Sequence, residues 1–473
     1  MTTTVLDPLL DRHQSGDQLF LPFDGPTNEK RRMQHQRISA YKVILLLIYG
    51  CCFWFLMKHL LWSYVTRLLK PYYQMDYADL LDRMEINCDG ILSNNHNVVQ
   101  TSKLMQYDTR TVEKLLLDAD DRCFAIRSLF GFDRKPISQE ERDYPLAYGL
   151  IVYKNLVQIL FMLSSFYRPQ NEYCIAVSGG ADSMFKLLID EVDSCFDNVH
   201  VLHRPRIDWG SFEIINSTYA CLELLSNSQT PWKYFQYLSG VDIPLKTNYE
   251  MVEIFKAWND TVNTEFAQFQ RQRVRSKRIE AAPLPLFKSS LSATVPRKAV
   301  DRIVQSSESR DLLRFLRNTS IPDESFWATL TGNVEKFPLP GGTDAAKWIE
   351  YRENYRKNHT AELAQSQNRT IIMRYYLSRY QLWNAKRCHG KLSSGSCIFG
   401  VDDIANVLEQ PHLVAHKLYI DFEPAAYFCG LKAIRSREGR PLELDVTPYR
   451  ELPQVELSAG IPYENLTHPL WLF

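Results

Sequence analysis

The stretch WKYFQYLSGVDIPLKTN, residues Trp232–Asn248, determines the fold that we expect for this chain. Aromatic residues crowd its first seven positions, which is typical of a short buried strand. Gly240 ends that strand, and the proline and the Thr-Asn pair that follow predict a new helix starting near Thr247. The strand therefore carries Asp242 into a loop at its carboxyl end, the edge where ligands of open α/β sheets bind.

Strands and helices alternate outward from this stretch. Asp208-Trp209-Gly210-Ser211 precedes a predicted helix over residues 212–227. Further strands are predicted over residues 146–153, 172–177 and 199–202, with a helix over 156–167. This alternation predicts an α/β fold, a mostly parallel sheet with helices on both faces. Residues 265–310 are polar and basic and are expected to leave the sheet, while residues 331–372 carry little pattern.

The bulk composition narrows the class of protein. The 473 residues suffice for one large domain with attachments. Lysine plus arginine equals aspartate plus glutamate at 55 each, so the basic footprint of a nucleic-acid-binding protein is missing and we expect no nucleic-acid partner. Aromatic residues make up 12%, which suits both a large core and a sugar-binding cleft.

An uncharged run from Val43 to Met57 is the candidate membrane span, and it reaches Trp62 if Lys58 extends toward the interface. Basic residues precede it at positions 30, 31, 32, 37 and 42, so the positive-inside rule places residues 1–42 in the cytosol. The rest of the chain would then be lumenal, in a single-pass type II membrane protein. No small-residue cleavage site follows Met57, which argues against a cleaved signal peptide. A buried core helix is the remaining alternative.

The cysteines and glycosylation sequons point to the same compartment. Eight cysteines follow the predicted span, an even number that suits four disulfides in an oxidising lumen. No CxxC pair occurs, so a zinc ribbon is not expected. Sequons on the predicted lumenal side begin at Asn216, Asn259, Asn318, Asn358, Asn368 and Asn465.

A series of landmarks runs through the chain between residues 145 and 430. They are Tyr173-Cys174-Ile175, Ser194–Val199, Trp209–Cys221, Trp232–Asn248, Pro322–Thr329, Ser396–Gly400 and His412–Lys417. In this order they resemble the core-2/I-branching β-1,6-N-acetylglucosaminyltransferase family. The resemblance implies a type II Golgi membrane enzyme with a GT-A-like fold that builds branches on O-glycans.

The resemblance also implies a division of the chain and its disulfides. We expect a cytosolic tail over residues 1–42, a transmembrane signal-anchor over 43–62, a stem and N-terminal lumenal region over 63–140, and a lumenal glycosyltransferase domain over 141–473. The family's disulfides would be Cys88–Cys429, Cys123–Cys195, Cys174–Cys221 and Cys388–Cys397. All eight lumenal cysteines are then used. Some relatives carry a further free cysteine where this chain has Ser239.

Glu324 is the candidate catalytic base. It matches the family's catalytic glutamate within the segment Pro322–Thr329. A carboxylate suits the group that deprotonates an acceptor hydroxyl, and one such base is enough for an inverting transfer. The residues alone also fit a simpler explanation, in which Asp323 and Glu324 complement the N-terminus of a helix.

The leaving diphosphate requires positive charge, and the resemblance implies that basic side chains supply it without a metal or other cofactor. The strand end that often holds a metal-binding Asp-x-Asp motif here contains only Asp242, which we place at the donor site. We treat Asp118-Ala119-Asp120 as a coincidence, because it precedes the first predicted strand. Lys417 matches the family's lysine, although a surface lysine is the simpler alternative. The partner arginine is replaced by Ser394, so Lys391 or Arg387 is the expected substitute.

The nucleotide and acceptor pockets follow from the resemblance alone. Ser178 stands where the family commonly has aspartate, and Asp182 is the candidate replacement. Trp209 would neighbour the uridine, Trp383 would stack on an acceptor sugar, and Glu265 and Arg273 fall in the acceptor-contacting stretch. The simpler explanations are core tryptophans and a solvated charged loop.

We therefore expect an inverting, metal-independent glycosyltransferase. It would move N-acetylglucosamine, or alternatively glucose, from a UDP-sugar to the 6-hydroxyl of an O-glycan sugar, forming a β-1,6 branch. Two alternatives stay open: a peptide O-xylosyltransferase-like enzyme, and a catalytically silent membrane-anchored glycan-binding protein, which Ser178 and Ser394 favour. The oligomeric state stays open as well.

Overall fold

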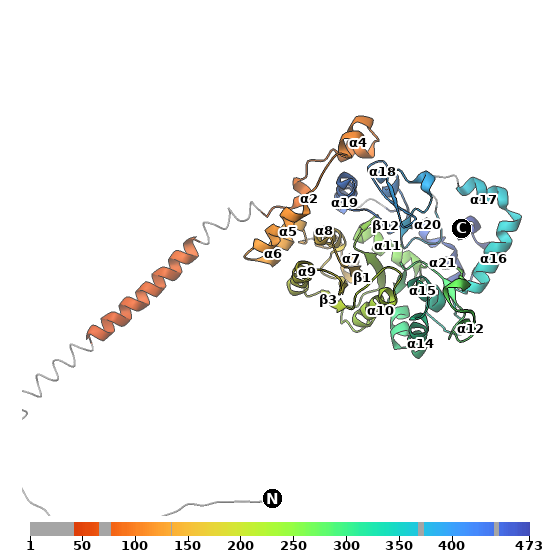
Figure 1. Ribbon diagram of the computed structural model, residues 1–473, viewed down its shortest axis with the longest axis horizontal. Helices are drawn as coiled ribbons and strands as arrows, with labels where there is room; N and C mark the ends of the chain where they lie inside the picture. The colour runs from red at the N-terminus through yellow and green to blue at the C-terminus, as the bar shows by residue number, and fades with distance from the viewer. Residues whose placement is uncertain (1–41, 66–76, 134, 368–372, 439–443) are drawn as a thin grey trace, which may run out of the picture. The chain divides into compact units, whose positions relative to one another are not determined.

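The computed structural model describes residues 42–65, 77–133, 135–367, 373–438 and 444–473 (Figure 1). The chain divides into two compact units, and the second begins at Tyr77. The first contains a helix of 24 residues, Lys42–Val65, which is long and apolar enough to cross a membrane and buries none of its side chains. It extends the predicted span 43–62 at both ends and fits a single-pass membrane anchor. The predicted cytosolic tail lies outside the described residues, apart from Lys42.

A five-stranded sheet forms the centre of the second unit, in the order β3-β2-β1-β4-β8. Its strands are β1 (Leu146–Val152), β2 (Glu172–Ser178), β3 (Val199–Arg204), β4 (Tyr234–Ser239) and β8 (Thr294–Pro296). The first four are parallel to one another, and β8 pairs antiparallel with β4. The predicted mostly parallel sheet is confirmed, and each predicted strand lies within two residues of its expected bounds.

Helices and smaller strands surround this sheet (Figure 1). The helices are α2 (Leu80–Arg83), α3 (Cys88–Leu92), α4 (His96–Ser102), α5 (Thr109–Asp118), α6 (Arg122–Phe130), α7 (Gln139–Asp143), α8 (Leu156–Phe166), α9 (Ser183–Cys195), α10 (Phe212–Ser226), α11 (Asn248–Trp258), α12 (Ser276–Ile279), α13 (Arg297–Gln305), α14 (Ser307–Leu316), α15 (Asp323–Thr331), α16 (Ala345–Asn358), α17 (Thr360–Gln367), α18 (Ile404–Leu408), α19 (Pro424–Glu438), α20 (Thr447–Arg450) and α21 (Pro453–Ser458). Short 3-10 helices are η1 (Arg271–Arg273), η2 (Ala385–Arg387), η3 (Tyr463–Asn465) and η4 (Pro469–Leu472). The remaining strands are β5 (Asp242–Pro244), β6 (Ala267–Gln268), β7 (Phe287–Lys288), β9 (Tyr380–Gln381), β10 (Lys391–Ser393), β11 (Ser396–Ile398) and β12 (Val414–His416).

The two faces of the sheet bury alternate strand residues in two separate cores. Tyr148 and Ile175 enter a core shared with α8, α9 and α11, whereas Ala147 and Phe235 enter one shared with α10, α13 and α15. The period of two follows from strand geometry, in which successive side chains point to opposite faces. The predicted helices on both faces are therefore confirmed, and the architecture has three layers.

Two segments differ from the sequence-based expectations. Residues 265–310 do not all leave the sheet, because β8 forms its antiparallel edge and α13 packs beneath it. A strand of three residues is too short to show a period of two, so the pattern could not reveal it. Asp242 begins strand β5 of a second sheet, in the order β5-β12-β9, rather than lying in a loop.

The predicted helix start after this strand is confirmed by a capping box. The Glu250 backbone N–H donates to Thr247 Oγ1 at 3.2 Å, and the Thr247 N–H donates to the Glu250 carboxylate at 2.8 Å. These two bonds satisfy backbone donors that no helical carbonyl reaches. The turn between β4 and α11 is thereby fixed, which positions the small second sheet against the main one.

The four disulfides that the resemblance implies are all present. Cys88–Cys429 joins α3 to α19, and Cys123–Cys195 joins α6 to α9. Residues 77–140, expected as part of a stem and N-terminal lumenal region, lie in the same compact unit as the sheet. Cys174–Cys221 joins β2 to α10 through the buried core.

Removing Cys174–Cys221 by a double alanine substitution should destabilise the protein by about 4 kcal/mol. The bond closes a loop of 47 residues, and chain-entropy loss in the unfolded state scales with the logarithm of that length. The matched control is Cys388–Cys397, whose loop of 9 residues gives about 2.6 kcal/mol. Denaturant titrations of both double variants test the order, and a larger loss for the short loop would contradict the argument.

The sequons differ in their accessibility. Asn259, Asn318, Asn358 and Asn465 are exposed. Asn216 lies within α10, and the hydroxyl residue of its sequon, Thr218, is buried. Asn368 lies outside the described residues. Thr261, the hydroxyl residue of the Asn259 sequon, is buried as well. Glycan attachment is therefore expected at Asn318, Asn358 and Asn465 in preference to Asn216 and Asn259.

Candidate active site

A cavity of about 1140 Å³ lies at the carboxyl ends of the parallel strands. Its walls include Tyr153 and Lys154 after β1, Gly180 after β2, and Gly240 and Val241 after β4. The predicted ligand edge of the sheet is thus hollow, as expected where side chains at strand ends do not fill the space. The volume slightly exceeds the roughly 300–1,000 Å³ of typical small-molecule pockets.

Glu324 lines this cavity from the first turn of α15, and its side chain is 26% exposed. The Arg273 guanidinium forms an ion pair with Glu324 Oε2, and Lys288 Nζ lies 3.6 Å from the same oxygen. These two cations fix the direction of the carboxylate through charge-assisted contacts. The cavity therefore contains a held carboxylate with one face open to a ligand.

Arg273 also holds the backbone turn that precedes Glu324. Its guanidinium donates to the Ile321 carbonyl at 3.1 Å, and its own carbonyl accepts from the Ser320 N–H at 2.9 Å. Ile321 has a φ of 49°, a left-handed conformation that a β-branched residue rarely adopts. Such a conformation is maintained only where surrounding contacts determine it. Arg273, predicted as an acceptor contact, instead does not line the cavity and lies behind Glu324 as its positioning partner.

Asp323, next to Glu324, is a buried carboxyl with an altered pKa. Burial raises its pKa from 3.8 to about 6, and the neighbouring charge of Glu324 adds to the rise. Among the described residues, its Oδ1 atom has no hydrogen-bond partner. Asp323 and Glu324 thus stand in different environments although they are adjacent in sequence, and only Glu324 has cationic partners within 4 Å.

The substitution Asp323→Asn should change the pH dependence of stability. Because the pKa of Asp323 is higher in the folded protein than the ordinary 3.8, folding stability falls as the pH rises from about 4 to about 6, and stays lower above it. The asparagine variant lacks this loss, which amounts to at most about 3 kcal/mol at 1.4 kcal/mol per pKa unit. Melting temperatures of the variant and wild type at pH 4 and pH 7.5 test this. A difference that stays the same at both pH values would contradict the assignment.

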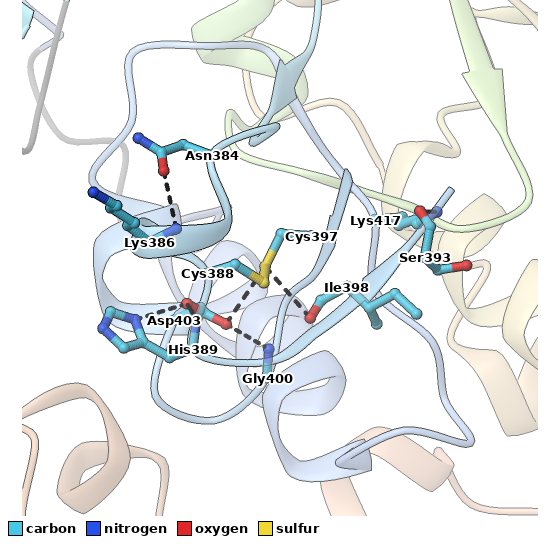
Figure 2. Close-up of a disulfide and its surroundings, with 10 residues drawn as sticks. All are labelled: Asn384, Lys386, Cys388, His389, Ser393, Cys397, Ile398, Gly400, Asp403 and Lys417. Carbon is cyan, nitrogen blue, oxygen red and sulfur yellow. Dashed lines mark hydrogen bonds and ion pairs between the residues drawn. A yellow bond between two sulfur atoms is a disulfide. The ribbon is translucent and has the colours of Figure 1, made fainter. Parts of the chain in front are cut away.

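Lys417 lines the same cavity directly after β12. Its Nζ donates to the Ser393 carbonyl at 2.9 Å, as Figure 2 shows beside the Cys388–Cys397 disulfide. Burial and the nearby Arg379 guanidinium lower the pKa of Lys417. The lysine is thus held by the β10–β11 hairpin, and two of its three ammonium protons remain for a ligand.

The β10–β11 hairpin contains Ser394, which replaces the expected arginine, and Lys391, one of its two candidate substitutes. Ser394 and Gly395 have φ angles of 49° and 79°, as the central residues of a tight two-residue hairpin turn require. Ser394 lines the cavity without a charge, and Arg387 lines it as well. Lys391 lies exposed on β10 and is not among the lining residues. The position of Arg387 therefore suits a substitute for the missing arginine better than that of Lys391.

Asp242 lies fully buried behind the cavity wall. Its carboxylate accepts from the Ser239 N–H at 2.7 Å and from the Ser239 hydroxyl at 2.9 Å, and lies 2.7 Å from His416 Nδ1. Burial lowers the pKa of His416 to about 4, so the ring is neutral at pH 7 with Nδ1–H donating to Asp242. The predicted donor contact Asp242 thus acts through His416, which lines the cavity and was missed.

The other predicted residues divide between the cavity and the surface. Ser178, Trp209, Glu265 and Trp383 all line the cavity, and the two tryptophans are 79% and 60% exposed, so neither is a core residue. Asp182 does not line it; the carboxylate caps α9 by accepting from the Phe185 N–H at 2.8 Å. Asp118 and Asp120 are exposed at the end of α5, away from the lining residues, as expected of a coincidental motif.

The main feature that sequence analysis missed is the charge of the walls. The lining residues include nine basic side chains, Lys154, Arg206, Lys288, Arg352, Arg356, Arg374, Arg379, Arg387 and Lys417, against four acidic ones, Asp208, Glu265, Asp323 and Glu324. The whole chain is neutral, so this excess of five positive charges is local. A cleft of one sign concentrates ligands of the opposite sign. Of these nine residues, the sequence analysis singled out only Lys417 and Arg387.

A comparison with known protein families identifies the family of this chain. The model described as "Core-2/I-Branching enzyme" matches residues 146–408, more than half of the chain. The chain therefore belongs to the core-2/I-branching enzyme family, and it is a glycosyltransferase.

Curated relatives cover most of the chain. A beta-1,3-galactosyl-O-glycosyl-glycoprotein beta-1,6-N-acetylglucosaminyltransferase of Homo sapiens is 26% identical over 377 residues, 73% of this chain and 84% of that protein. Enzyme 3 of the same description from Ovis aries is 27% identical over 363 residues, 71% of this chain and 79% of its own. Among solved structures, the mannosyltransferase Ktr4p from S. cerevisiae aligns over 54% of this chain and 80% of its own, at 11% identity and a TM-score of 0.22, a likeness too weak to use.

Proposed function

We propose that this glycosyltransferase moves N-acetylglucosamine, or alternatively glucose, from a UDP-sugar to the 6-hydroxyl of an O-glycan sugar, with inversion and without a metal. The observation that carries the proposal is one cavity that holds Glu324 and Lys417 on its walls at the carboxyl ends of the parallel strands. The relatives are named for β-1,6-N-acetylglucosaminyl transfer onto β-1,3-galactosyl O-glycans, which supports this linkage and this acceptor.

The transfer step assigns one task to each of these groups. Glu324 takes the proton of the acceptor hydroxyl while that oxygen forms a bond to the anomeric carbon. The bond from the anomeric carbon to the diphosphate breaks, and UDP leaves with the electron pair. Lys417 stabilises the growing charge on the diphosphate, with Arg387 as the expected second cation. A single carboxylate on the face opposite the leaving group gives an inverted, β-linked product.

The groups at the end of β4 support a reaction without a metal. Metal-dependent enzymes of this fold class use free carboxylates at this strand end to hold the ion. Here Asp242 is fully buried and is committed to Ser239 and His416. Lys417 and Arg387, which both line the cavity, supply the positive charge that a divalent ion would otherwise provide.

We also propose a Golgi location, with the catalytic unit in the lumen. The apolar helix, the four disulfides and the exposed sequons support it, because disulfides and N-glycans form in the secretory pathway. Protease protection of the C-terminal unit in sealed vesicles, together with endoglycosidase-resistant glycans, would be expected. Digestion of that unit from the cytosolic side would contradict the orientation.

A donor and acceptor panel tests the proposed reaction. The detergent-solubilised chain is incubated with UDP-N-acetylglucosamine, UDP-glucose or UDP-xylose and with galactosyl-β-1,3-N-acetylgalactosaminide or a serine peptide. Transfer of N-acetylglucosamine or glucose to a 6-hydroxyl, with a β anomeric coupling in the product and full activity in EDTA, is expected. Transfer of xylose to the peptide would instead indicate the peptide O-xylosyltransferase alternative.

A further inference from the structure

Three arginines form a patch on the cavity wall that the transfer step does not use. Arg352 and Arg356 come from α16, and Arg374 comes from the segment before β9. Within the described residues, none of their guanidinium groups forms an ion pair, and Arg352 Nε is buried without a hydrogen-bond partner. The Arg356 guanidinium stacks on the Phe473 ring at 5.3 Å, so it too is held at the cavity without a carboxylate.

Arg352 is the partly buried member of the patch, whereas Arg356 and Arg374 are exposed; other arginines with little exposure have carboxylate partners. Arg168 pairs with Glu438 at 2.8 Å, Arg435 with Asp79 at 2.8 Å, and Arg437 with Glu250 at 3.1 Å. Removing a cation from water without a counter-charge is unfavourable, so folded chains normally supply one. Arg352 lacks the counter-charge that these three arginines have, while Arg356 and Arg374 present their charge to solvent in the cavity.

The patch lies beside the residue expected to contact the acceptor. The negative charge of Glu265 favours higher pKa values for both Arg374 and Tyr375, and the positive charge of Arg352 favours a lower pKa for Tyr375. Tyr375 packs against Trp348 of α16, with tilted rings whose centroids are 4.8 Å apart, which joins the two segments of the patch. Desolvation by neighbouring protein atoms lowers the pKa of Arg374, although its side chain is exposed, and the nearby Arg387 charge lowers it further, so two cations lie close together here.

We propose that Arg352, Arg356 and Arg374 form a binding site for an anionic group on the acceptor glycan, a sugar carboxylate or a sulfate or phosphate ester. The inference rests on the proposed function, since it assigns the patch to the acceptor of that reaction. Guanidinium groups match such oxygens in pairs, and a charge-assisted hydrogen bond is stronger than a neutral one. Glu265 remains to accept hydrogen bonds from neutral hydroxyls of the same acceptor.

Steady-state kinetics of the full chain with three acceptors test the proposal. The acceptors are galactosyl-β-1,3-N-acetylgalactosaminide, its galactose sulfate ester and its sialylated form, so the two charged forms distinguish an ester from a carboxylate. At least one charged acceptor should show a kcat/KM about tenfold or more above the neutral one. Arg352→Gln and Arg374→Gln should each lower that value by about tenfold to a hundredfold and leave the neutral acceptor within twofold.

The control is Lys357→Gln, an exposed cation on the same helix outside the cavity lining, which should change no acceptor by more than twofold. A rise in the KM for the UDP-sugar with every acceptor would assign the patch to the donor and overturn the proposal. Equal loss with neutral and charged acceptors would overturn it as well.

If the wild-type chain transfers sugar to none of the acceptors, the proposed function fails rather than the patch. Calorimetric binding of the charged and neutral disaccharides to wild-type and Arg374→Gln protein then decides the patch separately. Tighter binding of a charged disaccharide that is lost in the variant supports it, and equal binding of all three overturns it.

Discussion

Replacing Glu324 by glutamine is expected to lower the kcat of sugar transfer by about a thousandfold, within the range for removal of a general base. The amide keeps the shape of the side chain but cannot take the acceptor proton. UDP binding should change by less than threefold, because Glu324 acts on the acceptor hydroxyl. Single-turnover transfer rates and calorimetric titration with UDP measure the two quantities.

The matched control is Glu335→Gln, whose side chain is 78% exposed and whose carboxylate pairs with Lys347 outside the cavity. It should transfer at the wild-type rate. Glu324→Gln also leaves Arg273 and Lys288 without their shared carboxylate, so the melting temperature must be measured in parallel. A folded Glu324→Gln protein that transfers sugar at the wild-type rate would rule out this residue as the base.

Replacing Lys417 by glutamine should lower kcat by about a hundredfold to a thousandfold, as removal of one aimed donor at a developing charge does in other enzymes. The ammonium group is anchored by the Ser393 carbonyl, so its position does not depend on the ligand. The loss should shrink with an activated nitrophenyl glycoside donor, because that leaving group requires less stabilisation. An equal loss with both donors would show that Lys417 does not act on the leaving group.

Two further variants serve as comparisons for Lys417. Lys391→Gln changes an exposed lysine outside the cavity lining and should have an effect below twofold. Arg387→Gln changes a lining residue and should lower kcat by about tenfold. A larger loss of kcat in Lys391→Gln than in Arg387→Gln would instead favour Lys391 as the substitute for the arginine that Ser394 replaces.

Much of the fold could be predicted because the signals for its longer strands and for its helix starts lie in short stretches of sequence. The aromatic run before Gly240 made β4 visible, and Thr247 with Glu250 formed the expected helix start. The three-residue strands β5, β8 and β12 gave no signal, since a period needs more residues than they contain. Their places in the sheets are set by tertiary pairing alone.

Site residues that lie within the sequence landmarks could be predicted. Site residues that only folding brings to the cavity could not. Glu324, Lys417 and Trp209 lay in landmarks and all line the cavity. Arg352 lies on a polar helix, and nothing in its neighbourhood distinguishes it from solvent-exposed arginines until the cavity is seen. Arg273 was placed in the right region but with the wrong partner, because its contact with the 320–324 turn spans about 50 residues of sequence.

The Cys88–Cys429 bond has a consequence for synthesis of the chain. Its two thiols are 341 residues apart, so the first waits unpartnered in the nascent chain until the last tenth is being made. Cys174 and Cys221, by contrast, can oxidise while the ribosome is still adding later segments. A ribosome-stalled product ending before residue 429 should therefore react with a thiol probe at Cys88, and any premature bond there has to be undone by an isomerase.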